Sequence, residues 1–261
     1  MLKLSPELQQ IDCSSGHYLV RFVTDNLELD QVARVRFNVF NQELNAGSDA
    51  SSAIERDLDK YDESCHHLML IDQKDNRVVG TYRMQTYDMA RQYHGFYSSE
   101  EFDLSSIPSS VIDDAVEIGR ACILKEYRSW RTFILLWQGI AAYLQCQNKC
   151  YLFGCSSLMS QDIAEGYAVL EYLRKKKMLH QDFWVNPTYK YKCLSESIAY
   201  KSLTVKQKQV ELPKLLQFYL KFGARVCSNP AIDRAFKSID FFTIFNIKDL
   251  RQKHSAFYVA G

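Results

Sequence analysis

The sequence lacks the features that would place this protein in a membrane or in an oxidising compartment. Its 261 residues contain no apolar run near the ~18 residues that a membrane-spanning helix needs. The opening residues, MLKLSPELQQ, show no apolar segment of the kind found in secretory signal peptides. The eight cysteines are scattered and form no CxxC pair, so we expect reduced thiols. These absences predict a soluble, cytoplasmic protein.

The chain also lacks an excess of charge of either sign. Its 32 lysines and arginines nearly balance 31 aspartates and glutamates, which argues against nucleic acid as a partner. No internal repeat appears, and no linker rich in proline, glycine or serine divides the sequence. With 47% apolar residues, the chain is long enough to bury a substantial core. We therefore expect one α/β domain.

In the first half of the chain, apolar periodicity predicts a helix followed by a hairpin. Residues 27–44 carry apolar side chains at helical spacing, with Asn26 available as the N-cap. Residues 67–71 and 78–87 are typical of two strands joined by a turn. Residues 89–113 show no sustained periodicity and are expected to form a long, functional connection.

The second half of the chain predicts a crossover between parallel strands. A strand over residues 115–124 precedes a buried helix over 132–147 and a strand over 151–158. Such units bind ligands beyond the end of the first strand, beside the N-terminus of the helix. The remaining expected elements are helices over 161–174 and 213–222, the latter ended by Gly223, and strands over 224–228 and 239–247.

One arginine lies on the apolar face of the first expected helix. Arg36 follows Val35 and precedes Phe40 by four residues, so an unpaired guanidinium there would be costly to desolvate. Asp57, Asp59 and Asp62, in the loop before the hairpin, are candidate partners. Two alternatives stay open, namely an arginine extending from the edge of the stripe and a merely solvated acidic loop.

The strand EIGRACI contains two charged residues in an apolar run. In a regular strand Glu117 and Arg120 would point to opposite faces, so a bulge at Gly119 would be needed to bring them together. Bulges often re-aim side chains beside active sites. The alternative is that Glu117 faces solvent from an edge strand while Arg120 makes a structural ion pair.

Taken in order, several motifs between residues 18 and 250 resemble one branch of the GNAT superfamily. This branch contains the ornithine-lipid-synthase-like (hemolysin-like) acyl-ACP-dependent N-acyltransferases, and the chain is more distantly similar to acyl-homoserine-lactone synthases. The motifs that carry the resemblance are RVRFNVFNQEL, ERDLDKYDESCHHLML, VVGTYRM, EIGRACI, LLWQGIAAYL, YLFGCSS and YLKFGARVCSNPAIDRAFKSIDFF.

The resemblance implies an α/β fold built as a single GNAT-like domain. Its central twisted sheet would be mixed but mostly antiparallel and flanked by helices, with a helical insertion at about residues 175–222 before the last strands. The acyltransferase domain would span residues 18–250. Residues 1–17 would form an N-terminal extension and residues 251–261 a C-terminal tail.

The same resemblance implies amide formation between an amino acid and an acyl group. An α-ammonium must lose a proton before it attacks a thioester, and Glu117 is the expected general base. Arg120 is the second expected catalytic residue. Arg120, Arg83 and Arg36 would bind the substrate carboxylate or hold the acidic loop in place. Within that loop, Asp59 and Asp62 would pair with these arginines or bind a cationic side chain such as that of ornithine.

The loop before the buried helix departs from the pattern of acetyl-CoA enzymes. GNAT enzymes that use acetyl-CoA generally carry a glycine-bearing QxxGxG/A loop there, whereas residues 128–133 of this chain include no glycine. A phosphopantetheine on acyl carrier protein has a single phosphodiester, and the carrier itself is acidic. Lys125, Arg128 and Arg131 are therefore expected to bind the carrier, with a solvated basic loop as the alternative.

We expect no metal and no bound cofactor, since Cys65, His66 and His67 lack a second cluster at ligand spacing. Cys122 is expected to pack rather than to react. The basic run at residues 174–177 is either a solvated helix end or a contact to anionic lipid at the inner membrane face.

The expected reaction moves a long-chain, 3-hydroxylated acyl group from acyl carrier protein to ornithine, giving a lyso-ornithine lipid. The alternatives are the same chemistry on glycine or another amine, and a non-catalytic lipid-binding protein.

Overall fold

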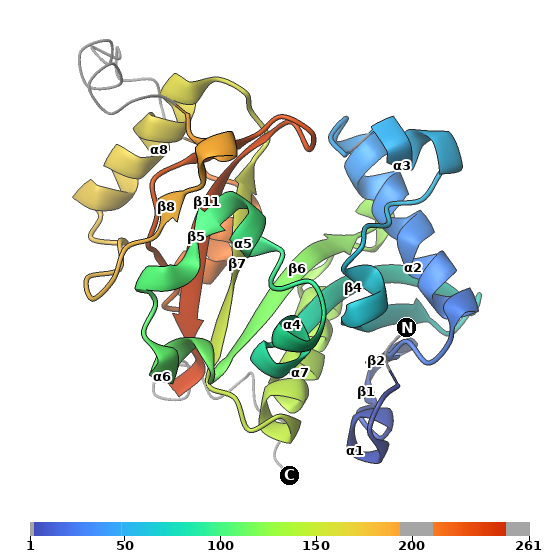
Figure 1. Ribbon diagram of the computed structural model, residues 1–261. Helices are drawn as coiled ribbons and strands as arrows, with labels where there is room; N and C mark the ends of the chain where they lie inside the picture. The colour runs from blue at the N-terminus through green and yellow to red at the C-terminus, as the bar shows by residue number, and fades with distance from the viewer. Residues whose placement is uncertain (1–2, 48, 194–210, 249–261) are drawn as a thin grey trace.

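The computed structural model describes residues 3–47, 49–193 and 211–248 (Figure 1). Its strands are β1 (Cys13–Ser15), β2 (Tyr18–Phe22), β3 (His66–Asp72), β4 (Arg77–Thr86), β5 (Phe102–Asp103), β6 (Ala115–Ile123), β7 (Tyr151–Leu158), β8 (Asn186–Pro187), β9 (Arg225–Val226), β10 (Ala231–Asp233) and β11 (Ser238–Asn246).

Nine of these strands form one sheet in the order β1-β2-β3-β4-β6-β7-β11-β10, with β9 paired to β11. Within the described residues, β6 and β7 are the parallel pair of this sheet, and its other ladders are antiparallel. The expected mixed, mostly antiparallel sheet is therefore confirmed, as are the hairpin of β3 with β4 and the parallel crossover. A separate small sheet pairs β5 with β8.

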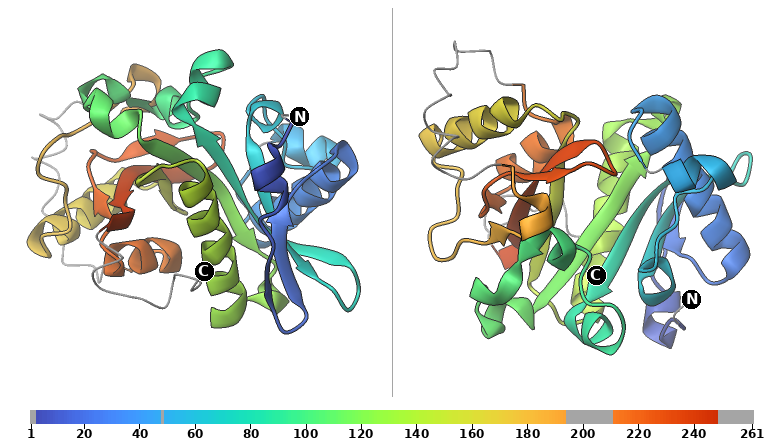
Figure 2. Two further views of the ribbon diagram at one scale, coloured as in Figure 1. Left: turned by 90° about the horizontal axis from the view of Figure 1, so that it is seen from below. Right: turned by 45° about the horizontal axis from the view of Figure 1, so that its top comes forward.

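Helices cover the sheet on both faces. The α-helices of the described residues are α1 (Pro6–Gln9), α2 (Asn26–Phe37), α3 (Asp49–Ile54), α4 (Tyr87–Gln92), α5 (Ser98–Glu101), α6 (Ser109–Ile112), α7 (Trp130–Cys146), α8 (Ile163–Lys175) and α10 (Lys214–Lys221). α2 contacts β4 and β6, while α7 contacts β1, β2 and β3 and lies across the sheet in the left view of Figure 2. On β3, His67 faces Arg36 of α2 and the next residue, Leu68, faces Gly139 of α7, so these helices lie on opposite faces.

The first long helix differs in two respects from its prediction. Its N-cap is Asp25, whose Oδ1 accepts a hydrogen bond from Glu28 N at 2.9 Å, so the prediction of Asn26 as the cap was wrong by one residue. The α-helix ends at Phe37 and continues as a π-helix over Asn38–Glu43. A π-helix makes wider turns than an α-helix, which the apolar spacing of the sequence does not reveal.

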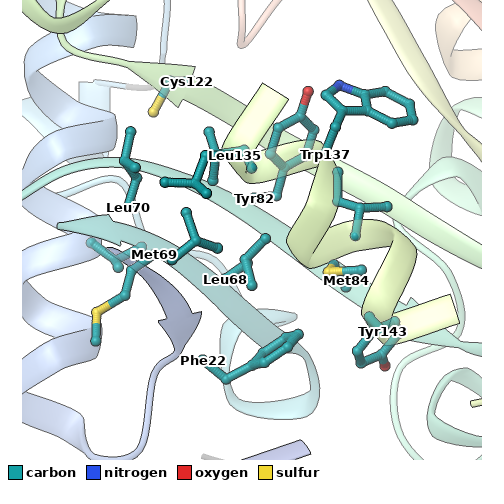
Figure 3. Close-up of a cluster of buried hydrophobic side chains, with 14 of the residues drawn as sticks. Phe22, Leu68, Met69, Leu70, Tyr82, Met84, Cys122, Leu135, Trp137 and Tyr143 are labelled. Atoms are coloured by element: carbon teal, nitrogen blue, oxygen red, sulfur yellow. The ribbon is translucent and has the colours of Figure 1, made fainter. Parts of the chain in front are cut away.

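The main core lies between α7 and the strands of the hairpin. As Figure 3 shows, Leu135 and Tyr143 of α7 meet Leu68, Tyr82 and other apolar side chains of the sheet. Burial of each such side chain stabilises the fold by about 1.5–3 kcal/mol. Gly139 permits the close approach, because a Cβ there would lie 2.8 Å from side-chain carbons of Leu68 and Val20.

The parallel strands of the crossover separate beyond their first three pairs. β6 pairs with β7 only from Ala115 to Glu117, and the two strands diverge after that point in Figure 1. Ser129 caps α7 and accepts a hydrogen bond from Thr132 N. We call the space between the diverging strands the wedge. It ends beside the N-terminus of α7, where the sequence predicts a ligand.

The ends of the expected domain remain predictions. Residues 6–9 and 13–15 form α1 and β1, and Leu8 is buried in the core. Within the expected insertion, β8 and α10 are described, whereas residues 194–210 and the expected tail at 251–261 lie outside the described residues. In the described part of the chain, no helix has both the length and the apolar character needed to cross a membrane.

Candidate active site

A cavity of about 760 Å³ lies in the wedge between β6 and β7. Residues 117–123 of β6 and 152–157 of β7 form two of its walls, and α7 and α10 contribute aromatic side chains. Its lining is predominantly apolar with a few buried polar groups, which is the usual character of a small-molecule site. The aromatic side chains in its wall are Phe40, Tyr82, Tyr97, Trp130, Phe133, Trp137, Phe153, Phe218, Tyr219, Phe236 and Phe245.

Glu117 lies at the point where β6 leaves β7. Its side chain is buried, and its carboxylate accepts hydrogen bonds from Tyr97 N at 2.9 Å and Ser98 N at 2.7 Å. Burial raises the pKa of Glu117, although these hydrogen bonds and the charge of Arg83 oppose the shift. The alternative of a solvent-facing glutamate on an edge strand is wrong, because β6 runs between β4 and β7.

A bulge in β6 brings Glu117 and Arg120 to the same cavity. Arg83 of β4 pairs with Gly119, whereas Thr81, two residues earlier, pairs with Cys122, so β6 has one extra residue there. The predicted bulge is present, but the residue with left-handed backbone is Arg120, at φ +49°, and not Gly119. Non-glycine residues rarely adopt this conformation, and when they do it often marks a functional site.

Three arginines hold the acidic loop, which we define as residues 57–62. Arg36 Nη1 lies 2.6 Å from Asp62 Oδ1, and Arg83 Nη1 lies 2.6 Å from Asp59 and 3.2 Å from Asp62. Arg120 Nη2 lies 2.8 Å from Asp59 Oδ2. Burial works against ionisation of Asp62, but the charges of Arg36 and Arg83 outweigh it and hold its pKa well below the usual range.

This network decides between the alternatives for Arg36. Its side chain is fully buried, so it does not extend from the edge of the helix into solvent. A second contact comes from His67, whose Nδ1 lies 2.8 Å from Arg36 Nη2 while its Nε2 lies 2.8 Å from the carbonyl of Asp62. The carbonyl can only accept, so Nε2 carries the proton and Nδ1 accepts. Burial lowers the pKa of His67 to about 3, which keeps the ring neutral.

The neighbouring histidine and the cysteines have separate environments. His66 Nδ1 lies 3.0 Å from Tyr143 Oη, on the face of β3 opposite His67. Burial raises the pKa values of Cys65 and Cys122 to about 12, so both are protonated at neutral pH. Cys122 therefore packs as a thiol beside the bulge.

The predicted site residues are only partly brought together. Glu117, Arg83 and Arg120 line the cavity, whereas Arg36, Asp59 and Asp62 lie behind them. Arg120 is further enclosed by the rings of Tyr97 and Phe236, whose centroids lie 4.9 and 5.3 Å from its guanidinium carbon.

Lys125, Arg128 and Arg131 are exposed around the start of α7. Arg128 lines the cavity but also donates two hydrogen bonds to Glu43, at 2.6 and 2.7 Å. Trp130, whose side chain is 63% exposed, lines the cavity beside it.

The polar residues of the cavity wall that sequence reasoning missed include Gln85, Glu101 and Asp240. Asp240 offered a signal, because it interrupts the apolar run of the last strand, IDFFTIFNI. Glu101 offered none, since SSEEFD is typical of a solvated turn.

Comparison with known proteins defines the class. The family described as Acetyltransferase (GNAT) domain matches residues 35–138. An L-ornithine N(alpha)-acyltransferase of Brucella abortus (strain 2308) is 30% identical over 253 residues, which cover 94% of this chain and 90% of that protein. One from Rhizobium meliloti (strain 1021) is 29% identical over 247 residues, covering 92% and 83% respectively. The fold and these matches define an acyltransferase of the GNAT superfamily. Within it, the chain belongs to the family of the L-ornithine N(alpha)-acyltransferases.

Two solved structures were compared with this fold. FeeM, an N-acyl amino acid synthase from uncultured soil microbes, is 11% identical with a TM-score of 0.52, covering 92% of this chain and 96% of that chain. The acyl-homoserine-lactone synthase LasI is also 11% identical, with a TM-score of 0.48 and coverage of 89% and 91%. The likeness to FeeM confirms the GNAT-like fold implied by the sequence motifs.

Proposed function

We propose that the protein transfers a long-chain, 3-hydroxylated acyl group from acyl carrier protein to the α-amine of ornithine, giving a lyso-ornithine lipid. The observation that carries this proposal is the buried carboxylate of Glu117 in the wall of a large, mostly apolar cavity. The activity named for the Brucella abortus and Rhizobium meliloti relatives supports ornithine as the acceptor.

Glu117 is assigned as the general base. Its raised pKa makes it a better proton acceptor than an ordinary glutamate, and the N–H groups of Tyr97 and Ser98 fix its orientation. The carboxylate removes a proton from the α-ammonium. The amine nitrogen then attacks the thioester carbonyl, the new C–N bond forms, and the C–S bond breaks. The phosphopantetheine thiolate leaves and takes up the second proton of the attacking nitrogen, which becomes the amide N–H. Glu117 then releases the first proton to solvent.

The arginines divide between two tasks. Arg83 and Arg120 line the cavity, so we assign them to the substrate carboxylate as well as to the acidic loop. Arg36 is fully buried behind them and is assigned to the loop through Asp62. The same pairing occupies Asp59 and Asp62, which argues against their binding a cationic substrate.

Acyl carrier protein is the proposed donor because the exposed side chains of Lys125, Arg128 and Arg131 suit an acidic partner. A competition experiment distinguishes acyl carrier protein from CoA as the donor. We expect free CoA to be a poor competitive inhibitor with respect to acyl carrier protein. Inhibition by CoA at concentrations comparable to the KM for acyl carrier protein would contradict this assignment.

The test uses purified protein with acyl carrier protein loaded with a 3-hydroxyacyl chain, and ornithine as acceptor. We expect thiol release and an N-acylornithine by mass spectrometry, with kcat lower by roughly 100-fold or more in Glu117→Gln. Glu63→Gln, which changes an exposed glutamate, is the matched control. Unchanged turnover in a folded Glu117→Gln variant would contradict the assigned base. If thiol is released with glycine but not with ornithine, the acceptor is glycine. If no thiol is released with any amine, the non-catalytic lipid-binding alternative is favoured.

A further inference from the structure

We propose that Glu101 and Asp240 form an acidic subsite that binds the side-chain ammonium of a diamino acid acceptor. This inference rests on the proposed function, because it assigns the residues that would distinguish ornithine from a neutral amino acid. We use the name acidic subsite for these two residues, which lie apart from the acidic loop.

The acidic subsite lies where α5 meets the end of the sheet. Glu101 ends α5, Asp240 belongs to β11, and Asp233 of the neighbouring strand β10 stands beside them. One carboxylate oxygen from each residue lies within 4.8 Å of the others. All three side chains are at least 95% buried. Within the described residues, no lysine or arginine forms an ion pair with any of them. A group of this kind is unfavourable unless a positive charge compensates it.

Unpartnered polar atoms point to a missing hydrogen-bond donor. In the described part of the chain, neither carboxylate oxygen of Glu101 has a hydrogen-bond partner of standard geometry, nor does Asp240 Oδ1. Tyr97 and Cys155 lie close enough to Glu101, and Ser157 to Asp240, to oppose the rise in the pKa of these carboxyl groups. The amide of Gln85, in the same cavity wall, also lacks a partner at both its nitrogen and its oxygen. Buried polar atoms are rarely left in this state, and an ammonium group supplies three donors.

Two nearby carboxylate oxygens, one of Asp240 and one of Asp233, already accept hydrogen bonds within the protein. Asp240 Oδ2 accepts from Ser238 Oγ at 2.7 Å. Asp233 Oδ1 accepts from Ala235 N at 2.8 Å and Phe236 N at 2.9 Å, and Asp233 does not line the cavity. Asp233 therefore adds negative electrostatic potential at Glu101 and Asp240 without reaching the cavity itself.

The spacing to Glu117 suits an acceptor with two amines. Ser98 N, which binds the Glu117 carboxylate, begins α5, and Glu101 ends it three residues later. Three residues of helix rise by about 4.5 Å. Gln85, the cross-strand partner of Glu117, lines the same cavity. An α-amine at Glu117 would thus leave a second amine, separated by a short aliphatic chain, at the acidic subsite.

The electrostatic environment favours a cationic ligand. Burial raises the pKa of Glu101 well above its usual range and that of Asp240 to about 6, so both carboxyl groups resist ionisation within the protein. A bound ammonium would stabilise the ionised forms, and affinity should rise as pH increases through the pKa values of these two carboxyl groups. The titratable or charged groups around the acidic subsite are Tyr97, Glu117, Arg120, Cys155, Tyr191 and Asp233.

The test compares ornithine with norvaline, which has the same carbon skeleton without the side-chain amine. We expect wild-type protein to prefer ornithine by roughly 100-fold in kcat/KM, since norvaline would leave the carboxyl groups unpaired. Glu101→Gln and Asp240→Asn should each raise the KM for ornithine by about 10-fold or more while changing kcat/KM for norvaline by less than about threefold. Glu100→Gln, the neighbour on α5 that bonds Tyr61 and Lys60 instead, is the matched control.

The outcomes separate this inference from the proposed function. Equal use of ornithine and norvaline by wild-type protein would contradict the acidic subsite while leaving amide formation intact. Stoichiometric binding of Ca²⁺ or Mg²⁺ that is lost in Glu101→Gln would also contradict it, because the carboxylates would then hold a metal. Failure to acylate any amino acid would contradict the proposed function itself.

Discussion

At the scale of single residues, the buried carboxyl groups differ in what compensates their charge. Asp62 forms ion pairs with two guanidinium groups. Glu117 accepts hydrogen bonds from two backbone N–H groups, and Asp240 Oδ2 accepts one from a hydroxyl. Their pKa values follow this order of compensation, since burial is outweighed at Asp62 and prevails at Glu117 and Asp240. The same residue types can therefore serve as anchor, base or ligand-binding group.

Asp240 should make stability fall as pH rises. Its folded pKa of about 6 lies above the ordinary 3.8, so the folded protein retains a proton that the unfolded chain loses. The free energy of unfolding should thus decrease between pH 4 and 6, by up to ~3 kcal/mol from this group. Asp240→Asn should match the wild type at pH 4 and exceed it at pH 7 in thermal melts. Asp75→Asn, in an exposed turn, is the control, and equal behaviour of the two variants would contradict the shift.

Arg36 should matter for stability far more than its exposed neighbour. Arg36→Met leaves Asp62 buried with one of its cationic partners removed, at a cost of about 3 kcal/mol. Arg34→Met, on the same helix, removes an exposed pair with Asp30 and should cost less than about 1 kcal/mol. Urea unfolding at neutral pH measures both. Similar midpoints for the two variants would show that the buried network does not stabilise the loop.

At the scale of elements, the site depends on how closely β6 approaches β7 before the strands diverge. A Cβ at Gly154 would lie only 2.2 Å from the backbone oxygen of Ile118. A Cβ at Gly119, across the cavity wall, would have no atom within 4 Å beyond its own chain neighbours, so this position has room for a side chain. The wedge therefore needs glycine at 154 and tolerates a side chain at 119.

This contrast gives a prediction for two glycine substitutions. Gly154→Ala should lower the free energy of unfolding by about 2 kcal/mol or more, because the backbone of β6 must move. Gly119→Ala should change it by less than about 0.5 kcal/mol. Circular dichroism during thermal unfolding measures both variants. A stable Gly154→Ala protein beside an unstable Gly119→Ala protein would refute the proposed packing of the wedge.

Elements were predictable where the signal is local. The hairpin of β3 and β4 follows from turn residues between apolar runs, and the buried helix from apolar residues all round. Asp25 replaced Asn26 as the N-cap because adjacent residues of similar capping strength compete within one turn. The short helices within residues 89–113 depend on tertiary contacts, such as those of Tyr97 and Ser98 with Glu117, and periodicity does not encode these.

Contacts between residues far apart in the sequence also limited what could be predicted of the site. A carboxylate partner for Arg36 was required by its place on an apolar stripe, and Asp62 supplies it. Sequence spacing could not predict that Arg83 and Arg120 both pair with Asp59. This shared ion pair depends on the bulge in β6 and on the conformation of the acidic loop, which form only in the folded protein. Glu101 and Asp240 are separated by 139 positions in the chain and meet only through the fold.

At the scale of the whole molecule, a nearly neutral chain carries a local basic surface. Lys125 and Arg131 are exposed near the start of α7, while the total formal charge is only +1. The double variant Lys125→Glu with Arg131→Glu should raise the KM for acyl carrier protein by about 10-fold at low salt. Its kcat should stay near the wild-type value. Lys74→Glu, in an exposed turn, is the control, and steady-state kinetics across a salt series measures the effect. An unchanged KM would contradict the binding of acyl carrier protein to this surface.

A second exposed basic run, at residues 174–177, ends α8. Its contact with anionic lipid remains a prediction. Sedimentation with anionic vesicles, unchanged when these four residues are neutralised, would contradict it.

Lipid mass spectrometry of cells that express the chain addresses the proposed reaction as a whole. Extracts from cells with wild-type protein, Glu117→Gln protein and empty vector are compared for new N-acyl amino acids. We predict an N-acylornithine that appears with the wild type alone, and the fragment ions of its head group would identify the acceptor in the same run. The same new lipid at equal abundance with Glu117→Gln, or none with folded wild-type protein in cells that supply ornithine and acyl carrier protein, would contradict the proposed function.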